Sequence, residues 1–520
     1  MYLAAVQRRR EGTKVDNSFS NNADPNVLQN EKTDAENVDV TAVDGSVPGW
    51  ALSEELAQAS RALRTATWLN VFYLITTDIL GPTSAPWSFS QLGYVPGVLL
   101  YVFMGAAAAY TGWQIWRMYL GMDSDRFPLR NYADLAGRIF GKTAEHIINV
   151  LQCIQLLFNV AVIILGNGQG LSQVAVNGNV CFTVLVLIWA LAGMFVGQIR
   201  SLKNFGWLAN FAIWLNLLVI FITMGVVAHT APNYVGSAAQ NQTTGTIVQT
   251  AAFIDNNLYQ KIVGVMQIVY SYGGAMMFVN FLAEMKRPFD FWKGMVVAQL
   301  VIFSCYMFYG IFVYAYQGQF TMNPGNQGIS DYAYQTATNV LQLVSALIAA
   351  GLYGNVGLKV VYNTIIEDLL RGPKLNSKKG RYLWVVLVVV YWAIAYVIAS
   401  AIPQFSNISS LVAAVCILQF TYTFPPLFML GYEIQRDAIL PEEYVDERTG
   451  LPGKRVDTWR DFSRWKRGFA RRWYIKLFNL LFFLAALATA GLSIYSSIVA
   501  IIAGFQNSPA ATSFGCGSPV

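Results

Sequence analysis

The chain has 520 residues, of which 55% are hydrophobic and only 12% are charged. Soluble globular domains carry about 25% charged residues, so this composition excludes an ordinary soluble protein and indicates an integral membrane protein with several spans. Its five cysteines show no paired spacing and it has only two histidines, so we expect no metal site, no disulfide framework and no bound cofactor.

Residues 1–67 are predicted to form a cytosolic tail. Residues 1–50 are rich in Asn, Asp, Ser and Glu and lack apolar periodicity, which is typical of disorder. Residues 51–67 carry spaced leucines and are expected to form a short amphipathic lead-in helix. No signal-peptide core is present, so the first membrane helix is expected to direct insertion.

The first membrane helix lies in the stretch 68–97 and is interrupted. It begins as an apolar helix, meets Asp78, and then reaches Gly81-Pro82-Thr83-Ser84. Proline removes a backbone donor and clashes with the preceding turn, so the helix is expected to break near the bilayer midplane. Bare backbone at that depth is costly unless it lines a protein cavity, and an intramembrane carboxylate marks a functional site.

Apolar runs of spanning length, roughly 20 residues, recur along the rest of the chain. With the first helix they predict an all-α membrane protein of about eleven transmembrane helices within residues 68–504. The other ten are placed near 98–120, 146–168, 180–198, 205–229, 260–283, 291–316, 335–366, 382–402, 407–432 and 474–504. Residues 505–520 are expected to form a small, mobile extracytosolic tail.

The basic residues predict the orientation of these helices. With a cytosolic N-terminus and eleven alternating helices, 34 of the 35 Lys and Arg residues fall in cytosolic segments or at cytosolic helix ends, and only Lys261 lies outside. A different number of helices would scramble this separation. The C-terminus is therefore expected to be extracytosolic, and the plasma membrane is favoured over the vacuolar membrane.

Two connections between helices carry further signals. In the outer connection 230–259, Asn241 begins an Asn-Gln-Thr sequon and is a candidate glycosylation site, with a chance match as the alternative. In the cytosolic connection 433–473, aromatic and basic residues alternate at helical spacing between Trp459 and Trp473. This pattern suits an amphipathic helix on the anionic lipids of the membrane surface. Beside a membrane helix, nucleic-acid binding is the weaker interpretation, so no nucleic-acid partner is expected.

A second interruption falls in the sixth helix, at Ser271-Tyr272-Gly273-Gly274. Double glycine weakens a helix, although it also permits close helix packing. Helices 1 and 6 are five apart, and matched breaks at mid-membrane are typical of inverted-repeat transporters with a site at the repeat interface. We therefore predict a five-plus-five inverted repeat with one extra helix.

Two broken helices suit the head group of an amino acid. Where a helix restarts, free N–H groups favour a carboxylate, and where it stops, free carbonyl groups favour an ammonium or a cation. The two tyrosines beside the second break are expected to act as a gate. The predicted substrate-binding residues on these helices are Thr77, Gly81, Pro82, Thr83, Ser84, Tyr270, Ser271, Tyr272, Gly273 and Gly274.

Three further polar residues are candidates for the transport pathway. Gln155 and Asn159 share one face of helix 3, where they either line the pathway and bind substrate or bond to neighbouring helices. Asp78 is the candidate for ion coupling, because a membrane-buried carboxylate that meets a cation can exchange protons between two access states. A carboxylate held by a neighbouring donor for structural reasons is the alternative.

These residues resemble the amino acid/auxin permease family of transmembrane amino acid transporters, and in particular the fungal neutral amino acid permeases. The resemblance covers roughly residues 68–430. It rests on the helix 1 run LGPTSAPWSFSQLGYVPG, on Tyr132-Ala133-Asp134-Leu135-Ala136-Gly137 and on Glu284-Met285-Lys286-Arg287-Pro288. It implies a leucine-transporter-type fold with eleven helices and proton-driven import of amino acids. Of the two glycines usual in helix 1 of the family only Gly81 is present here, after Asp78, so the resemblance does not define the substrate.

The sequence as a whole predicts a secondary active transporter that imports neutral amino acids by proton symport with alternating access. The alternatives are a sodium-coupled or nucleobase carrier of the same fold, and a non-transporting amino acid sensor. An enzyme is not indicated, because the glycine-rich run 166–170 is followed by Leu171 where a nucleotide loop needs glycine. A channel would need a filter or a ring of charges, and the sequence indicates neither.

Overall fold

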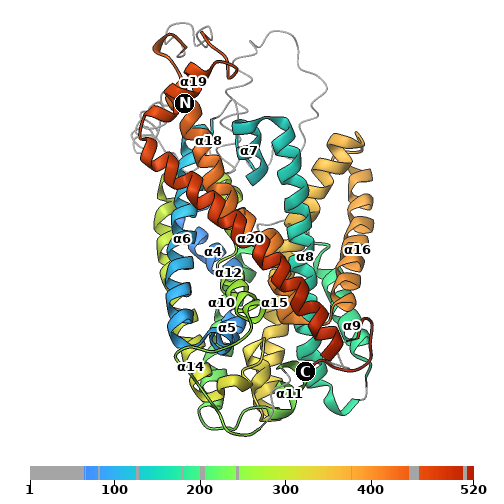
Figure 1. Ribbon diagram of the computed structural model, residues 1–520. Helices are drawn as coiled ribbons and strands as arrows, with labels where there is room; N and C mark the ends of the chain where they lie inside the picture. The colour runs from blue at the N-terminus through green and yellow to red at the C-terminus, as the bar shows by residue number, and fades with distance from the viewer. Residues whose placement is uncertain are drawn as a thin grey trace, which may run out of the picture.

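The computed structural model describes residues 64, 66–79, 82–124, 128–178, 180–199, 205–241, 245–375, 377–443, 456–507 and 512–520. Across these ranges every regular element is helical, apart from two isolated β-bridges (Figure 1). The predicted disordered tail at 1–50 and most of the lead-in helix at 51–67 lie outside the described residues.

The membrane helices follow one another in the predicted order, which confirms the all-helical membrane fold. Nine helical segments of the described ranges are long and apolar enough to span a membrane, and α9 is a shorter apolar helix. The interrupted helix 1 completes a set of eleven. The uninterrupted helices are α6 (Tyr94–Met122), α8 (Lys142–Val174), α9 (Phe182–Val196), α10 (Phe205–Val227), α14 (Phe291–Gln317), α15 (Tyr332–Val361, continued by η8, Tyr362–Leu369), α16 (Lys378–Ala401) and α20 (Trp473–Asn507).

Besides α15, which ends in the π-helix η8, three membrane segments depart from a regular helix. Helix 1 consists of α4 (Trp68–Ile79), η1 (Pro82–Ser84) and α5 (Ala85–Leu92). Helix 6 consists of α12 (Leu258–Ser271), η4 (Ala275–Met277) and α13 (Phe278–Glu284). Helix 10 runs from α17 (Phe405–Val412) through two π-helical stretches to α18 (Phe424–Ala438), and Pro425 and Pro426, which have no N–H to donate, lie just after the widened turns.

A short helix at one end of the bundle, α7 (Tyr132–Phe140), shows what one of the family-like motifs does. The side chain of Asn131 accepts the N–H of Asp134 at 2.8 Å, and the carboxylate of Asp134 accepts the N–H of Asn131 at 3.1 Å. This reciprocal capping box satisfies two donors that a helix start leaves free. Asp134 therefore fixes where α7 begins.

The helices pack in two groups that meet at the interrupted segments. Helix α8 packs against α9, α15 and α16, whereas α14 packs against both halves of helix 1 and against α6. The long helix α20 crosses the bundle diagonally on its outside and packs on α12, α17 and α18 (Figure 1). Much of α20 faces outward, as expected for an appended helix in contact with lipid.

The C-terminal segment 512–520 is held against the bundle, so the prediction of a mobile tail is wrong. Cys516 forms a disulfide bond with Cys181, and the N–H of Phe182 donates to the carbonyl of Cys516 at 3.1 Å. The hydroxyls of Ser172 and Ser518 are 2.8 Å apart. The expectation of no disulfide is wrong as well, because two cysteines 335 residues apart show no spacing that indicates a pair.

The disulfide constrains the topology of the chain. Cys181 precedes α9 and Cys516 follows α20, and a bond between them requires both to lie at the same face of the membrane. The number of crossings between them must therefore be even. Eight membrane segments lie between the two cysteines, namely α9, α10, α12–α13, α14, α15, α16, α17–α18 and α20.

This pairing is tested by cutting the chain between the two cysteines. A protease site inserted between Gly245 and Thr246, both exposed, separates Cys181 from Cys516. After cleavage the two fragments are expected to migrate together on a gel without reductant and apart with it. Cys516→Ser should separate them without reductant, whereas Cys305→Ser, which changes a free cysteine, should not. Separation of the unmodified fragments without reductant would contradict the pairing.

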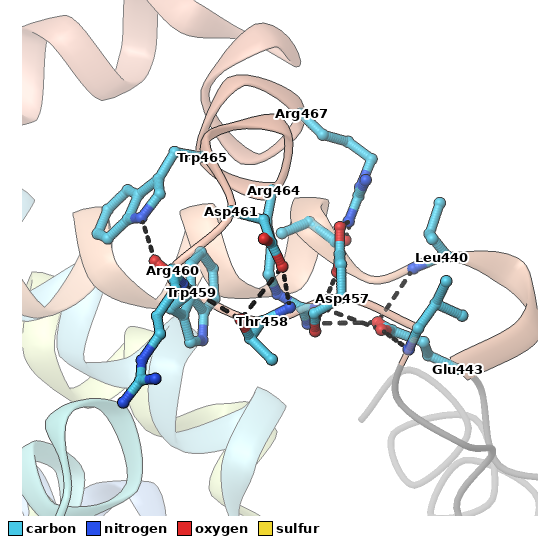
Figure 2. Close-up of polar contacts among 12 residues, drawn as sticks. Leu440, Glu443, Asp457, Thr458, Trp459, Arg460, Asp461, Arg464, Trp465 and Arg467 are labelled. Carbon is cyan, nitrogen blue, oxygen red and sulfur yellow. Dashed lines mark hydrogen bonds and ion pairs between the residues drawn. The ribbon is translucent and has the colours of Figure 1, made fainter.

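The predicted amphipathic helix is present as α19 (Phe462–Ala470), but two of its arginines point into the protein. Arg464 is 3% exposed, pairs with Glu443 at 2.9 Å and also pairs with Asp457 (Figure 2). Arg467 pairs with Asp457 at 2.8 Å and donates to the carbonyl of Ala438 at 2.8 Å. These two arginines fasten α19 to the end of α18.

The hydrogen bonds of Glu443 keep it charged. The Arg464 guanidinium, followed by the N–H of Val456, lowers the pKa of Glu443 from 4.5 to about 2. A carboxyl whose pKa is lowered on folding stabilises the fold above its ordinary pKa, and this contribution is lost as the pH falls through the lowered value. The pairing of Glu443 with Arg464 therefore persists until the pH approaches about 2, whereas the stability that it contributes begins to fall below about pH 4.5.

Arg464→Ala is expected to release α19, because it leaves the Glu443 and Asp457 carboxylates without their shared partner. Backbone hydrogen exchange in residues 456–470 should accelerate by at least about tenfold, with α20 unchanged. Lys466→Ala, which removes an exposed base of the same helix, serves as the control. Equal exchange in the two variants would show that the ion pairs do not hold the helix.

Candidate functional site

The break in helix 6 is a tight turn followed by a restart. At the end of α12 the N–H of Tyr272 donates to the carbonyl of Val269 at 3.2 Å, and the N–H of Gly273 donates to that of Tyr270 at 3.1 Å. Helical structure resumes at η4, where the N–H of Met277 donates to the carbonyl of Gly274 at 2.9 Å. The chain thus changes from α to 3₁₀ geometry at the predicted position.

Helix 1 restarts in the same way. The 3₁₀ turn η1 leads directly into α5, whose first residues include Pro86, and a proline in the first turn of a helix removes no bonded donor. α12 packs on both η1 and α5, so the two interrupted helices lie side by side. The predicted breaks in helices 1 and 6 are therefore both present and adjacent.

A cavity of about 150 Å³ opens between these breaks and α8. One water needs roughly 10–15 Å³ of such space, so a small organic solute fits. Eight of the predicted binding residues line it, from helices 1, 3 and 6: Thr83, Ser84, Gln155, Asn159, Tyr270, Ser271, Gly273 and Gly274.

Other predicted residues are not among the lining residues. Tyr272 is 1% exposed, and its hydroxyl donates to the carbonyl of Tyr101 in α6 at 3.1 Å. It therefore packs helix 6 against α6 rather than gating the cavity. Gly81 lies outside the described residues, as do the side chains of Thr77, Asp78, Pro82 and Asn241.

The described lining combines apolar side chains with polar ones but holds no charged side chain. No Asp, Glu, Lys, Arg or His side chain of the described ranges borders the cavity. Eight side-chain amides do so instead, together with the hydroxyls of Thr83, Ser84, Ser271 and Ser345. Neutral dipoles bind a solute that carries no net charge, because a net charge buried without a counter-charge is costly.

Sequence reasoning missed six of these eight amides. They are Asn167 on α8, Asn216 on α10, Asn326 and Gln327 in the connection after α14, and Asn339 and Gln342 on α15. Asn167 follows Gln155 and Asn159 by twelve and eight residues, which turns it by about 120° and about 80° from them, so the helical face that they define did not indicate it. The others belong to elements that only the tertiary fold brings to helix 1.

The connection 318–331 covers the cavity at the face that carries the disulfide. Its residues Asn323, Asn326 and Gln327 are at most 2% exposed, although the segment has only two short 3₁₀ turns, η6 and η7. Side-chain amides fasten its backbone. Gln335 donates to the carbonyls of Gln327 and Ile329, Gln317 donates to that of Gly328, and Gln240 donates to that of Asn323.

The chain is similar to known membrane transporters over most of its length. The family described as "Transmembrane amino acid transporter protein" matches residues 64–435. The "N amino acid transport system protein" of Neurospora crassa is 24% identical over 457 residues, 86% of this chain and 87% of the relative. A "Transmembrane transporter" of Fusarium pseudograminearum is 22% identical over 370 residues, which are 71% of this chain and 75% of the relative. "Lysine histidine transporter-like 1" of Arabidopsis thaliana is 23% identical over 70% of this chain and 80% of its own.

The contact between helix 1 and the connection 318–331, called the cover from here on, depends on a glycine. A Cβ added at Gly325 would lie 3.0 Å from the hydroxyl of Tyr309 and 3.1 Å from the carbonyl oxygen of Thr83, a backbone atom that cannot rotate away. Gly325→Ala is therefore expected to lift the connection and to speed thiol labelling of Ser345→Cys in the cavity, measured with an impermeant reagent applied at the disulfide face. A shift of about 1.4 kcal/mol toward the lifted state corresponds to a tenfold higher labelling rate.

The background for this measurement replaces the free cysteines Cys153, Cys305 and Cys416 and keeps the disulfide. Gly225→Ala is the matched control, because a Cβ there meets nothing within 4 Å. If Gly325→Ala and Gly225→Ala label at the same rate, the contact with Thr83 does not seat the cover.

Proposed function

The chain belongs to the transmembrane amino acid transporter family, and from this premise we propose that it imports neutral amino acids by proton symport with alternating access. One observation carries the proposal: two adjacent helix breaks border a cavity whose described lining holds no charged side chain. A neutral amino acid is a zwitterion with no net charge, and such a cavity suits it.

The two helix breaks supply the partners for the head group. The 3₁₀ turn η1 stands at the start of α5, where free N–H groups and the positive end of the helix dipole attract a carboxylate. The α-carboxylate of the substrate binds there, beside the hydroxyls of Thr83 and Ser84. The α-ammonium faces carbonyl groups where α12 ends near Tyr270.

Asp78 is the proposed proton site. It lies in α4, one turn before the predicted break, and it is the only acidic residue between Trp68 and Leu92. A carboxylate at this depth is costly unless it is protonated or paired, so binding a proton as substrate enters lowers the cost of crossing. Protonation in one access state and release in the other then couples the two fluxes.

The proposed orientation places the N-terminus in the cytosol and the C-terminus outside it. The bases of the chain gather at one end of the helices, and the disulfide lies at the other. Disulfides persist in oxidising compartments, which supports an extracytosolic location for Cys181 and Cys516. We propose the plasma membrane rather than the vacuolar one. The exposed Phe462, Trp465 and Lys466 of α19 then rest on anionic lipids of the cytosolic leaflet.

The proposal is tested with purified chain in liposomes that carry a proton gradient or a sodium gradient, imposed separately. Radiolabelled neutral amino acid is expected to accumulate when the outside is acidic. When sodium is the imposed gradient, it is expected to equilibrate without accumulating. Asp78→Asn should keep exchange of substrate down its own gradient but lose accumulation driven by protons. Glu442→Gln, which removes an exposed carboxylate in the connection after α18, is the control for loss of an acidic residue far from the site.

Each alternative has its own signature in this assay. Accumulation driven by sodium alone would identify a sodium-coupled carrier. Uptake of nucleobases in place of amino acids would identify a different substrate class. Binding without uptake would identify a sensor. Unchanged proton coupling in Asp78→Asn would remove Asp78 from the mechanism and leave the transport proposal standing.

A further inference from the structure

The inner halves of the two interrupted helices close the cavity on the side away from the disulfide. No described residue of α4 or α13 is among the residues that line the cavity. Val71 and Ile75 of α4 are fully buried, and Thr76 is 1% exposed. A solute that leaves the cavity toward this face therefore has to pass α4 and α13, which requires one of them to move.

Backbone hydrogen bonds fasten the chain that enters α4 to the exit of helix 6. The N–H of Ala66 donates to the carbonyl of Glu284 at 3.0 Å, and the N–H of Lys286 donates to the carbonyl of Ala66 at 3.0 Å. Ala66 and Met285 thus form a parallel β-bridge, and they are 8% and 1% exposed. The two interrupted helices, which lie side by side at their breaks, are therefore also joined where helix 1 begins and helix 6 ends.

An ion pair fastens the same segment to the end of α6. Arg64 Nη2 lies 3.6 Å from Asp123 Oδ2, and the side chain of Asp123, the residue directly after α6, is fully buried. Asp123 Oδ1 also accepts the N–H of Leu129 at 3.0 Å, which holds the carboxylate in place. A buried charge that loses its partner is costly, so Asp123 favours the conformation in which Arg64 stays beside it.

Two further contacts complete this end of the bundle. Trp116 Nε1 of α6 donates to the carbonyl of Pro288 at 2.9 Å, so α6 is also tied to the exit of helix 6. Gly294, near the start of α14, lies against the first turn of α4, because a Cβ added there would lie 2.6 Å from the carbonyl oxygen of Trp68. The start of α4 is therefore held by three neighbours, namely α6, α14 and the exit of helix 6.

From these contacts we propose that Arg64, Ala66 and Asp123 form a latch on the cytosolic exit of the cavity, and that the latch is closed in this structure. The inference rests on the proposed transport by alternating access and on the proposed orientation. Opening the latch breaks two backbone hydrogen bonds and one ion pair, after which α4 can separate from α13 and open a path past the helix breaks. Neutral hydrogen bonds are of moderate strength and Arg64 is partly exposed to water, so these contacts can break and form again in each transport cycle.

The first test locks the latch with a disulfide bond. Neighbouring strands lie about 4.8 Å apart, a separation that a disulfide can bridge, so Ala66→Cys combined with Met285→Cys should cross-link on oxidation with copper phenanthroline. The background replaces the free cysteines Cys153, Cys305 and Cys416. In liposomes, exchange of radiolabelled neutral amino acid should fall in proportion to the cross-linked fraction, because a chain that cannot open this exit completes no cycle.

Two controls accompany the cross-link. They are the double variant before oxidation and the oxidised background without the two new cysteines, and both should exchange substrate. Failure of the cross-link to form, or full exchange by the cross-linked chain, would overturn the latch.

The second test loosens the latch in the full chain in detergent. Arg64→Gln leaves the Asp123 carboxylate without this arginine, so Thr76→Cys in α4 should react at least about tenfold faster with a water-soluble thiol reagent. Arg64→Lys keeps the positive charge and should restore most of the protection. Arg130→Gln, which removes an exposed base from the connection after α6, is the matched control and should leave the rate unchanged. Ser345→Cys in the cavity should react no faster in Arg64→Gln, whereas general unfolding would speed both reactions.

The labelling measurement separates this inference from the transport proposal, because it needs no flux of substrate. Faster labelling of Thr76→Cys in Arg64→Gln, with protection restored in Arg64→Lys, would support the latch even if the liposomes accumulated no amino acid. That last outcome would overturn only the proposed transport. Equal labelling of Thr76→Cys in Arg64→Gln and Arg130→Gln would overturn the latch even if transport were confirmed, and so would an equal acceleration at Ser345→Cys.

Discussion

The need to satisfy backbone hydrogen-bonding groups inside a membrane shapes this molecule. A helix pairs its own N–H and C=O groups, and a helix that stops at mid-membrane leaves several of them open. Helices 1 and 6 both do so, at η1 and at Gly273–Gly274, and they lie against each other. The open groups need polar surroundings, so amides and hydroxyls from α8, α10 and α15 gather around them. The cavity is the consequence of the two breaks.

The cover over the cavity meets the same demand by other means. Residues 318–331 are buried but are not in a long helix, so their carbonyl groups depend on side chains. Glutamines supply those donors, because a carboxamide on a flexible stem can reach a backbone oxygen and still offer an acceptor to the next residue. A chain of amide hydrogen bonds from Gln173 through Asn339 to Asn326 arises in this way. The same amides therefore fasten the cover to α8 and α15.

The features that depend on local sequence could be predicted, and those that depend on distant contacts could not. Gly81-Pro82 and Gly273-Gly274 disturb a helix wherever it packs, so both breaks were placed correctly. Gln155 and Asn159 were found because their spacing defines a helix face. Asn326 and Gln327 lie in a connection with no periodicity, and only the fold brings them over helix 1. The disulfide joins cysteines that flank eight membrane segments, and the inward turn of Arg464 depends on Glu443, which lies 21 residues earlier in the chain.

The placement of charge follows from the cost of removing it from water. Arg464, Glu443 and Asp457 lie beyond the end of α18, where each of these largely buried charges has an opposite charge beside it. At the depth of the helix breaks the described lining offers no such counter-charge, only apolar groups and neutral dipoles. Neutral amides also suit a site that must release its ligand, since they bind by hydrogen bonds of moderate strength and can re-pair with one another. A carboxylate in helix 1 stands against this rule. Asp78 is therefore the residue whose presence calls for a function, and the proposed proton that binds and leaves with the substrate would remove its cost.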